Sequence, residues 1–463
     1  MPTTAEAGLV RAIGTRQLTA SIINTTIGAG IFVLPAAAAA GLGPAAPMAY
    51  VVCAVLMALI VCCFAAAGSR VSLSGGVYAY VEVAFGPFVG VLAGVLYFLM
   101  ATFAVASVSS AFAGSVGVLW PAATTTIGRT IVIAALFASL AAVNIRGVRL
   151  GARLVEVATA AKLLPLLVLV GVGIWFVNVD YLRWPAQPDA AAVGRTAIVL
   201  IFAFVGLEIA LAPSGEVRDA ARTVPRALFS ALAMTTTLYL LIQTVAQGLL
   251  GPSMATYAAS PLAEAASRVL GRSGRLLVLA GATVSMFGYV SGDMLGSPRA
   301  LFAFARDGLL PSALARVHPR FHTPSVAIAV YAAIVATLAA SSSFTQLAIL
   351  ANVAALTLYL MCVAASYQLQ QRNVRSDGTP FVLPAGPLVP MLAASVIIWL
   401  LSHATRREFA VEAIVLAATT LAYFIRKGGG QSWGGSQKPP RGARVRPIAS
   451  GEDEVPPARS SGS

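Results

Sequence analysis

The chain has 463 residues, of which 58% are hydrophobic and only 10% are charged, and its mean hydropathy is +0.84. Soluble globular domains carry about 25% charged residues, so this balance excludes a soluble protein and indicates one that crosses a membrane several times. The formal charge of +14 does not indicate a nucleic-acid-binding protein, because the basic residues are spread over short loops and do not cluster on one module.

The first apolar run, from about Leu18 to Ala40, contains two glycines one residue apart, Gly28 and Gly30. Each glycine costs about 1 kcal/mol relative to alanine inside a helix. Backbone groups freed in hydrocarbon are tolerated only when they are buried in protein or face a wet cavity. We therefore expect a discontinuous first helix whose second half begins near Gly30 and points its N-terminal amides at an anionic group. A close helix–helix contact through small residues is the alternative interpretation.

Twelve apolar stretches are long enough to be membrane spans, and the sequence predicts an all-α membrane protein with twelve transmembrane helices. The spans are expected at 17–40, 45–68, 87–118, 127–144, 152–176, 195–218, 226–250, 276–305, 325–341, 346–370, 386–403 and 409–425.

Short-loop arginines set the expected orientation. Arginines fall mainly in alternate loops, for example Arg70, Arg218 and Arg372, and the basic residues at both chain ends fall on the same side. Positively charged loops stay in the cytoplasm, so we expect a multi-pass protein of the cell (inner) membrane with both termini cytoplasmic. The N-terminus is expected at 1–16, and a disordered cytoplasmic tail rich in Gly, Pro, Ser and Arg at 426–463.

A second interrupted helix is expected in the sixth span, where Phe202-Ala203-Phe204-Val205-Gly206-Leu207-Glu208 is followed by Pro213. If the first five spans (17–176) and the next five (195–370) are two copies, corresponding spans are offset by about 180–200 residues. Five is an odd number, so the second copy would be inverted, and the last two helices (386–425) would be additions. Paired broken helices in two halves indicate the central site of a transporter.

Three ionisable residues lie deep inside spans: Lys162, Glu208 and Asp293. A charge at that depth costs at least about 2.5–3.5 kcal/mol, so each is expected to face protein or water. We interpret them as binding or coupling groups that exchange protons. The alternative is a structural ion pair or a satisfied polar contact, such as Asp293 with Arg299.

Cysteine and histidine chemistry is not expected. The four cysteines all fall inside apolar spans, where they are typical packing residues, so we predict neither a disulfide nor a metal site. No phosphate-binding loop or nucleophile–base arrangement is present in the sequence, so we predict that the chain is not an enzyme and uses no cofactor.

Four stretches together resemble the amino acid–polyamine–organocation superfamily of permeases. They are TTIGAGIFVLPA (25–36), SGGVYAYVEVAFGPFVG (74–90), FAFVGLEIALAPSGEVRDAARTVPRAL (202–228) and SPRALFAFARDGLLP (297–311), and they occur in the family's order and spacing. The resemblance implies a five-plus-five inverted-repeat fold, with helices 1 and 6 discontinuous and two extra helices, that works by alternating access.

The same resemblance implies a substrate site at the two breaks. The α-carboxylate of the substrate would be held at the first break, which in this sequence comprises Thr26, Ile27, Gly28, Ala29, Gly30 and Ile31. The α-ammonium would be held at the second break, at Phe202, Ala203, Phe204 and Val205, with the Phe202 ring as a gate. Lys162 matches a fifth-helix lysine whose ammonium replaces a sodium ion that bridges the fifth helix to the first.

These observations together predict a secondary active transporter of amino acids, driven by protons or by exchange and not by sodium. Its expected partners are the amino acid, protons and the bilayer, and the sequence carries no signal for an oligomeric state. The alternatives are an exchanger of polyamines or cationic amino acids and, from a different class, a membrane sensor that binds a small molecule without moving it.

Overall fold

The computed structural model describes residues 13–73, 76–146, 162–184, 187–211, 214–306, 310–375 and 378–428. Within these ranges the regular structure is helical, apart from one isolated β-bridge between Ile13 and Val217. Seven helical stretches of the described chain are long and apolar enough to cross a membrane, and four shorter apolar helices accompany them. The protein is therefore an all-α, multi-pass membrane protein.

The helices follow the apolar runs of the sequence. A shorter apolar helix covers Lys162–Phe176. The remaining α-helices of the described residues are α1 (Thr15–Thr26), α2 (Gly30–Leu42), α3 (Ala46–Gly68), α4 (Val77–Phe85), α5 (Pro87–Leu119), α6 (Thr126–Arg146), α8 (Ala190–Leu200), α9 (Ala220–Leu250), α10 (Pro261–Arg306), α11 (Ser325–Ser341), α12 (Phe344–Gln371), α13 (Leu388–Leu401) and α14 (Arg406–Gly428).

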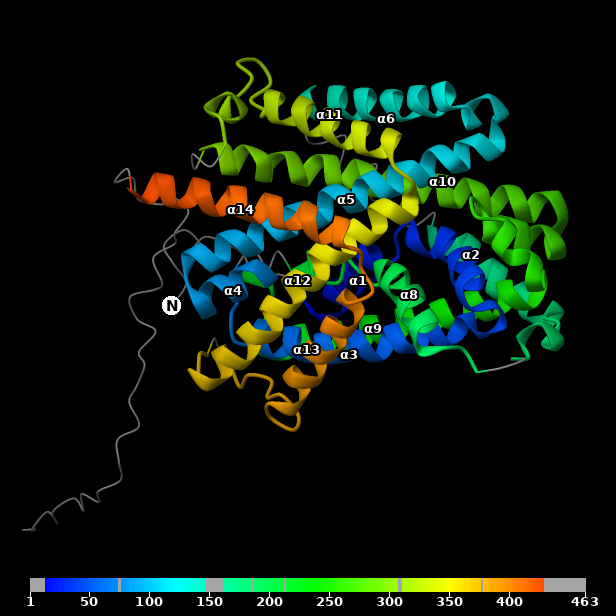
Figure 1. Cartoon of the computed structure of the whole chain (residues 1–463), viewed down its shortest axis with the longest axis horizontal. Helices are drawn as coiled ribbons and strands as arrows, with labels where there is room; N and C mark the ends of the chain where they lie inside the picture. The colour runs from blue at the N-terminus through cyan, green and yellow to red at the C-terminus, as the bar shows by residue number, and fades with distance from the viewer. Residues whose placement is uncertain are drawn as a thin grey trace, which may run out of the picture.

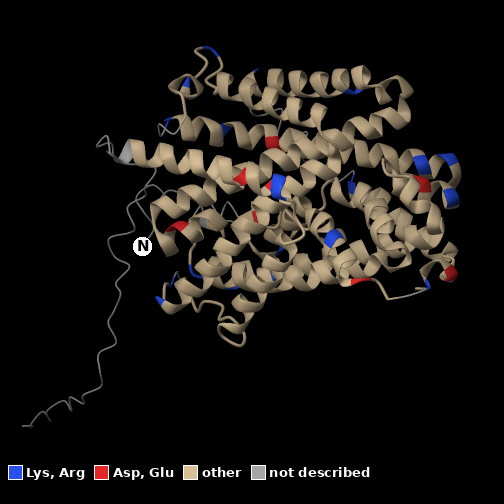
Figure 2. Ribbon diagram, viewed as in Figure 1, with Lys and Arg blue, Asp and Glu red and all other residues tan. Residues whose placement is uncertain are grey.

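The helices form one bundle with α1 near its centre (Figure 1). Helix α10 runs through most of the molecule's length, while α6 and α11 lie side by side along one edge (Figure 1). Helix α1 packs against α9, and α2 packs against α8, in the interior of the bundle. Charged residues gather near the helix ends, and few lie in the middle of the bundle (Figure 2). This distribution is what a hydrocarbon surrounding requires.

The helix bounds differ from the expected spans mainly near loops. Helix α5 covers Pro87–Leu119 against an expected span of 87–118. Helix α9 begins at Ala220, six residues before the expected seventh span, because Arg222 and Arg226 extend the helix beyond its apolar part. Helix α10 begins at Pro261 and continues across a kink at Gly271, whose φ is +60°. Residues 152–161 of the expected fifth span, and the expected tail from residue 429, lie outside the described residues.

One arginine ties three helices together at the edge of the bundle. The Nη2 atom of Arg129, on α6, donates to the Ser110 hydroxyl on α5 and to the carbonyl oxygens of Ala339 and Ser342 at the end of α11, each at 2.8 Å. The last carbonyls of a helix have no partner within the helix, and a guanidinium is suited to them because it presents several donors in one plane.

We expect Arg129→Ala to lower the free energy of unfolding by about 1–3 kcal/mol, because it leaves two carbonyls and a hydroxyl without their charged donor. Thermal unfolding of the purified protein in detergent measures the change. Arg268→Ala, at an exposed arginine of α10, is the control and should leave the unfolding temperature unchanged. Equal unfolding temperatures for the two variants would contradict this role of Arg129.

Candidate functional site

The first break in a helix lies where the two glycines predicted it. Helix α1 ends at Thr26 and α2 begins at Gly30. The Gly28 amide donates to the Thr26 carbonyl at 2.8 Å. Among the described residues the amides of Ala29, Gly30 and Ile31 have no backbone acceptor. The start of α2 therefore offers the donors that give a helix N-terminus its affinity for anions.

The second break follows α8. The helix tightens into a 3-10 turn over Ile201–Ala203, and the amides of Phe204 and Val205 both donate to the Ile201 carbonyl. Gly206 has a φ of +120°, a conformation that side chains other than glycine's rarely adopt. A new 3-10 turn begins at Ile209. The chain is thus non-helical for several residues inside the bundle.

The two breaks are in direct contact. A β-carbon on Gly206 would lie 2.5 Å from the Thr25 carbonyl oxygen, so only a glycine permits this approach of the two backbones. The Tyr239 hydroxyl, on α9, donates to the Ala203 carbonyl at 2.8 Å and to the Thr26 carbonyl at 3.1 Å. One buried side chain therefore supplies a hydrogen bond to a freed carbonyl on each side of the contact.

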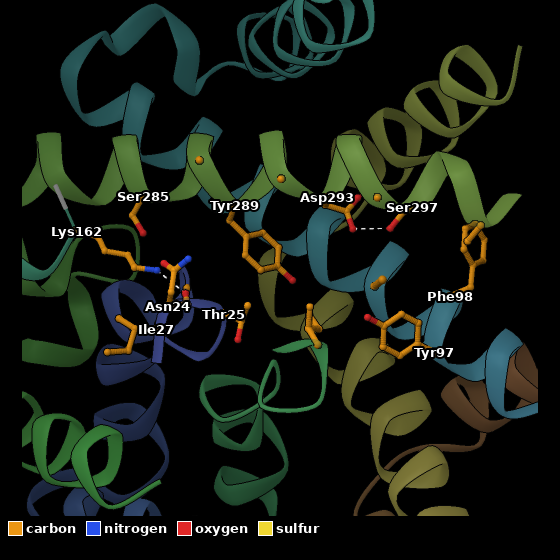
Figure 3. A pocket seen from close by; sticks show the side chains of 17 residues that line it. Asn24, Thr25, Ile27, Tyr97, Phe98, Lys162, Ser285, Tyr289, Asp293 and Ser297 are labelled. Carbon is orange, nitrogen blue, oxygen red and sulfur yellow. Dashed lines mark hydrogen bonds between the residues drawn. The ribbon is translucent and has the colours of Figure 1, made fainter. Parts of the chain in front are cut away.

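A cavity of about 450 Å³ lies beside the first break. Its walls are the end of α1 with Ile27 and Gly28, one face of α10, part of α5 with Tyr97, and the side chain of Lys162. Figure 3 shows Lys162 and Asn24 at one end of the cavity, the Tyr289 ring in the middle, and Asp293 beyond it, before Tyr97 and Phe98 at the other end. The volume lies in the range of small-molecule sites, about 300–1,000 Å³.

Lys162 connects its helix to the first break. Its side chain is 6% exposed, and its Nζ donates to the Asn24 carbonyl oxygen at 2.5 Å. Asn24 lies in the last turn of α1, so its carbonyl is one of those that the end of the helix leaves without an internal partner. The amine thereby holds the end of α1 at the cavity wall.

The two carboxylates differ in what they face. Asp293 lines the cavity, where its Oδ1 accepts from the Ser297 hydroxyl and its Oδ2 from the Tyr331 hydroxyl, both at 2.7 Å. Glu208 is 1% exposed and is not among the residues that line the cavity. It accepts from its own loop at the Gly206 amide, at 3.0 and 3.1 Å, and from the Tyr359 hydroxyl at 2.6 Å. Glu208 thus stabilises the second break in this conformation.

Among the other expected site residues, two line the cavity and the rest are buried beside it. Ile27 and Gly28 line it, whereas Thr26, Ala29 and Ile31 are at most 3% exposed and are packed away from it. Gly30 is buried against the Phe202 ring and Ala203, since a β-carbon there would lie 3.2–3.3 Å from them. At the second break, the rings of Phe202 and Phe204 pack edge-on against Phe344 and Tyr239, and Ala203 and Val205 are also buried.

Several tyrosines and one serine at the site were not predicted as site residues from the sequence. Tyr97 and Tyr289 line the cavity, and Tyr239 bridges the breaks. Ser285 is 4% exposed and lines the cavity, and its hydroxyl has no hydrogen-bond partner among the described residues. The four-residue spacing of Gly288, Gly292 and Gly296 along α10 is the signal that could have indicated this wall, because it places them on one helix face.

Comparisons with known proteins cover most of the chain. The family model described as amino acid permease matches residues 13–417. A methylthioribose transporter of Bacillus subtilis is 28% identical over 90% of this chain and 93% of its own length. A serine/threonine exchanger of the same organism is 27% identical over 84% and 90%. A transporter of Mycobacterium tuberculosis, whose solute its name does not give, is 33% identical over 88% and 89%.

We expect Gly206→Ala to destabilise the fold by about 1–3 kcal/mol, because the methyl group meets the Thr25 carbonyl in a backbone conformation that alanine rarely adopts. Gly94→Ala in α5 is the matched control, since a β-carbon there has nothing within 4 Å. An alanine in a helix interior should leave stability unchanged or raise it by up to about 1 kcal/mol. Thermal unfolding of both variants in detergent decides this, and a Gly206→Ala protein as stable as the control would contradict the contact.

Proposed function

Because the chain belongs to the amino acid permease family, whose members are transporters and not enzymes, we propose that it carries amino acids across the cell membrane by alternating access, coupled to protons or to exchange. The observation that supports this proposal best is the direct contact of two helix breaks beside a cavity. Freed peptide groups at such breaks bind the charged ends of a zwitterion, with amides at the start of a half-helix suited to a carboxylate.

The topology belongs to the same proposal. Twelve spans would form two inverted five-helix repeats and two added helices. The first broken helix would consist of α1 and α2, and the sixth of α8 and the segment through Leu211. Both termini would be cytoplasmic, since the arginines of α9 and of the α10–α11 connection fall on one side in this order. The contact of Gly206 with Thr25 supports this pairing, because corresponding breaks of two repeats meet near the membrane centre.

The amino acid would lie with its carboxylate against the turn from Ile27 to Gly30. The cavity reaches Ile27 and Gly28 and ends before Ala29, whose amide lacks a backbone acceptor among the described residues. Movement of α1 away from Gly206 would extend the cavity to these amides. It would also free the Thr26 carbonyl from Tyr239, so that it could accept from the ammonium group, while Tyr239 keeps its bond to the Ala203 carbonyl.

Lys162 is the proposed coupling group. A hydrogen bond from a charged donor contributes about 1.5–3 kcal/mol, whereas one between neutral groups contributes about 0.5–1.5 kcal/mol. Loss of the proton from Nζ would therefore weaken its bond to the Asn24 carbonyl and loosen the end of α1. A proton gradient could then bias the position of α1, which is a two-state element of the kind that switches require. Glu208 and Asp293 remain candidates for the proton's path.

We expect Lys162→Met to abolish the stimulation of uptake by an inward proton gradient, because the variant has no proton to exchange at this position. The measurement is uptake of radiolabelled lysine, serine and leucine into liposomes that contain the purified protein. Each amino acid is tested with and without the pH gradient, at constant membrane potential.

Lys162→Arg is the matched control, since arginine keeps a cation near the Asn24 carbonyl and does not release its proton at neutral pH. It should preserve binding in a thermal-shift assay and still lose the response to the pH gradient. Uptake that is driven by a sodium gradient and is indifferent to pH would contradict the coupling role of Lys162.

We expect Gly28→Leu to abolish uptake while the protein still folds. A β-carbon at Gly28 would lie 3.8 Å from the Tyr289 ring, an ordinary contact, so the larger side chain extends into the cavity without displacing backbone. Uptake in liposomes and the unfolding temperature in detergent are measured together. Normal uptake by this variant would remove the first break from the substrate's path.

A further inference from the structure

A row of three glycines on α10 forms part of the cavity wall. Gly288, Gly292 and Gly296 recur at every fourth residue and all line the cavity, and a β-carbon on Gly296 would have nothing within 4 Å. Residues at this spacing lie on one side of a helix. The wall therefore leaves room for an extended chain that runs parallel to the helix.

Asp293 is the acidic group on this wall, and its charge has no counterion. Both of its oxygens accept from neutral hydroxyls, those of Ser297 and Tyr331. Among the described residues, the ion pairs within 4 Å are those of Arg183, Arg222 and Arg275 with other acids, and none includes Asp293. A carboxylate at this depth is stable as a charge only when a cation compensates it.

A second, independent observation indicates that the wall is incomplete without a ligand. Ser285 lies at the Lys162 end of the same helix and is 4% exposed, and its hydroxyl has no hydrogen-bond partner in the part of the chain that the structure describes. A buried hydroxyl without a partner costs about 1–3 kcal/mol. Among the described residues, Ser285 thus lacks a hydrogen-bond partner, and Asp293, whose oxygens accept only from neutral hydroxyls, lacks a counterion.

We propose that Asp293 determines substrate specificity by binding the ammonium or guanidinium at the end of a long amino acid side chain. The inference rests on the proposed function and narrows its substrate to cationic amino acids. The side chain lies along the glycine wall of α10, and its terminal cation supplies the missing counterion of Asp293. This assigns Asp293 to substrate recognition in place of a coupling role, and it leaves proton coupling to Lys162 and Glu208.

The distance along α10 from Tyr289 to Asp293 indicates how long the side chain of the substrate is. Gly28, where the carboxylate end of the substrate is placed, faces Tyr289. Asp293 follows Tyr289 by four residues, about 6 Å along the helix axis. An extended lysine side chain, with five single bonds of about 1.5 Å in a zigzag, spans a similar distance. Short side chains such as those of serine and alanine do not reach Asp293.

The experiment compares pairs of amino acids that differ in the terminal charge. Lysine is paired with norleucine, which lacks the ammonium, and arginine with citrulline, in which a urea replaces the guanidinium. Apparent Kd values come from thermal-shift titrations of the purified full-length protein in detergent, for the wild type, Asp293→Asn and the exposed control Asp180→Asn.

We expect the wild type and Asp180→Asn to bind lysine and arginine at least about tenfold more tightly than their neutral partners, since a charged hydrogen bond is worth about 1.5–3 kcal/mol. Asp293→Asn should bind both members of each pair equally, with the affinity for norleucine unchanged.

Two results would overturn the inference and leave the proposed function standing. The first is that the wild type binds norleucine as tightly as lysine. The second is that Asp293→Asn weakens the binding of norleucine and the binding of lysine by the same factor, which would make Asp293 a structural residue. If the wild type binds none of the four amino acids, the inference fails; if it also takes up none of lysine, serine and leucine into liposomes, the proposed function fails with it.

Discussion

The structure depends on how two interrupted helices satisfy their main-chain hydrogen bonds inside an apolar bundle. An unpaired peptide group in hydrocarbon costs several kcal/mol, so a break is possible only where other groups replace the lost helical partners. In this chain the replacements are few and specific. Tyr239 donates to a carbonyl of each break, Lys162 donates to the Asn24 carbonyl, and Glu208 accepts from the Gly206 amide. Each of these groups is therefore both a structural partner and a point at which the breaks can be released.

This arrangement explains why two of the buried charged residues, Lys162 and Glu208, lie next to the breaks. A lysine or a glutamate would be unfavourable beside a regular helix, whose peptide groups are already paired. Beside a break the same side chain finds main-chain donors or acceptors, and its burial is compensated. Lys162 and Glu208 follow this rule, one on each break. Asp293 does not, because it lies on the unbroken part of α10 and accepts from side-chain hydroxyls. Its position in the cavity wall, away from both breaks, is the reason to assign it a separate role.

The sequence was sufficient to predict the features that follow from composition and from the energetic cost of particular residues within a helix. Two glycines one residue apart predicted the first break, and the family match over residues 13–417 confirms the resemblance to the permeases. Features that depend on how helices are rotated were out of reach. In the sequence, Glu208 and Asp293 are both acidic residues deep inside an apolar span. In the structure, Glu208 is enclosed by its own loop and Tyr359, whereas Asp293 faces the cavity.

Tyr239 is the clearest case of a functional residue that sequence reasoning misses. Its partners are main-chain carbonyls 213 and 36 residues away, which have no side-chain signature, and it is one of 12 tyrosines in the chain. The same geometry makes it informative about transport. Its hydroxyl has one hydrogen for two carbonyls, so movement of α1 away from the second break removes one acceptor while the other bond is kept. The hydrogen-bond energy of Tyr239 therefore differs little between the arrangement in which the two breaks are in contact and the one in which they are separated. In the proposed transport cycle, Lys162 and the molecule in the cavity would decide which arrangement is favoured.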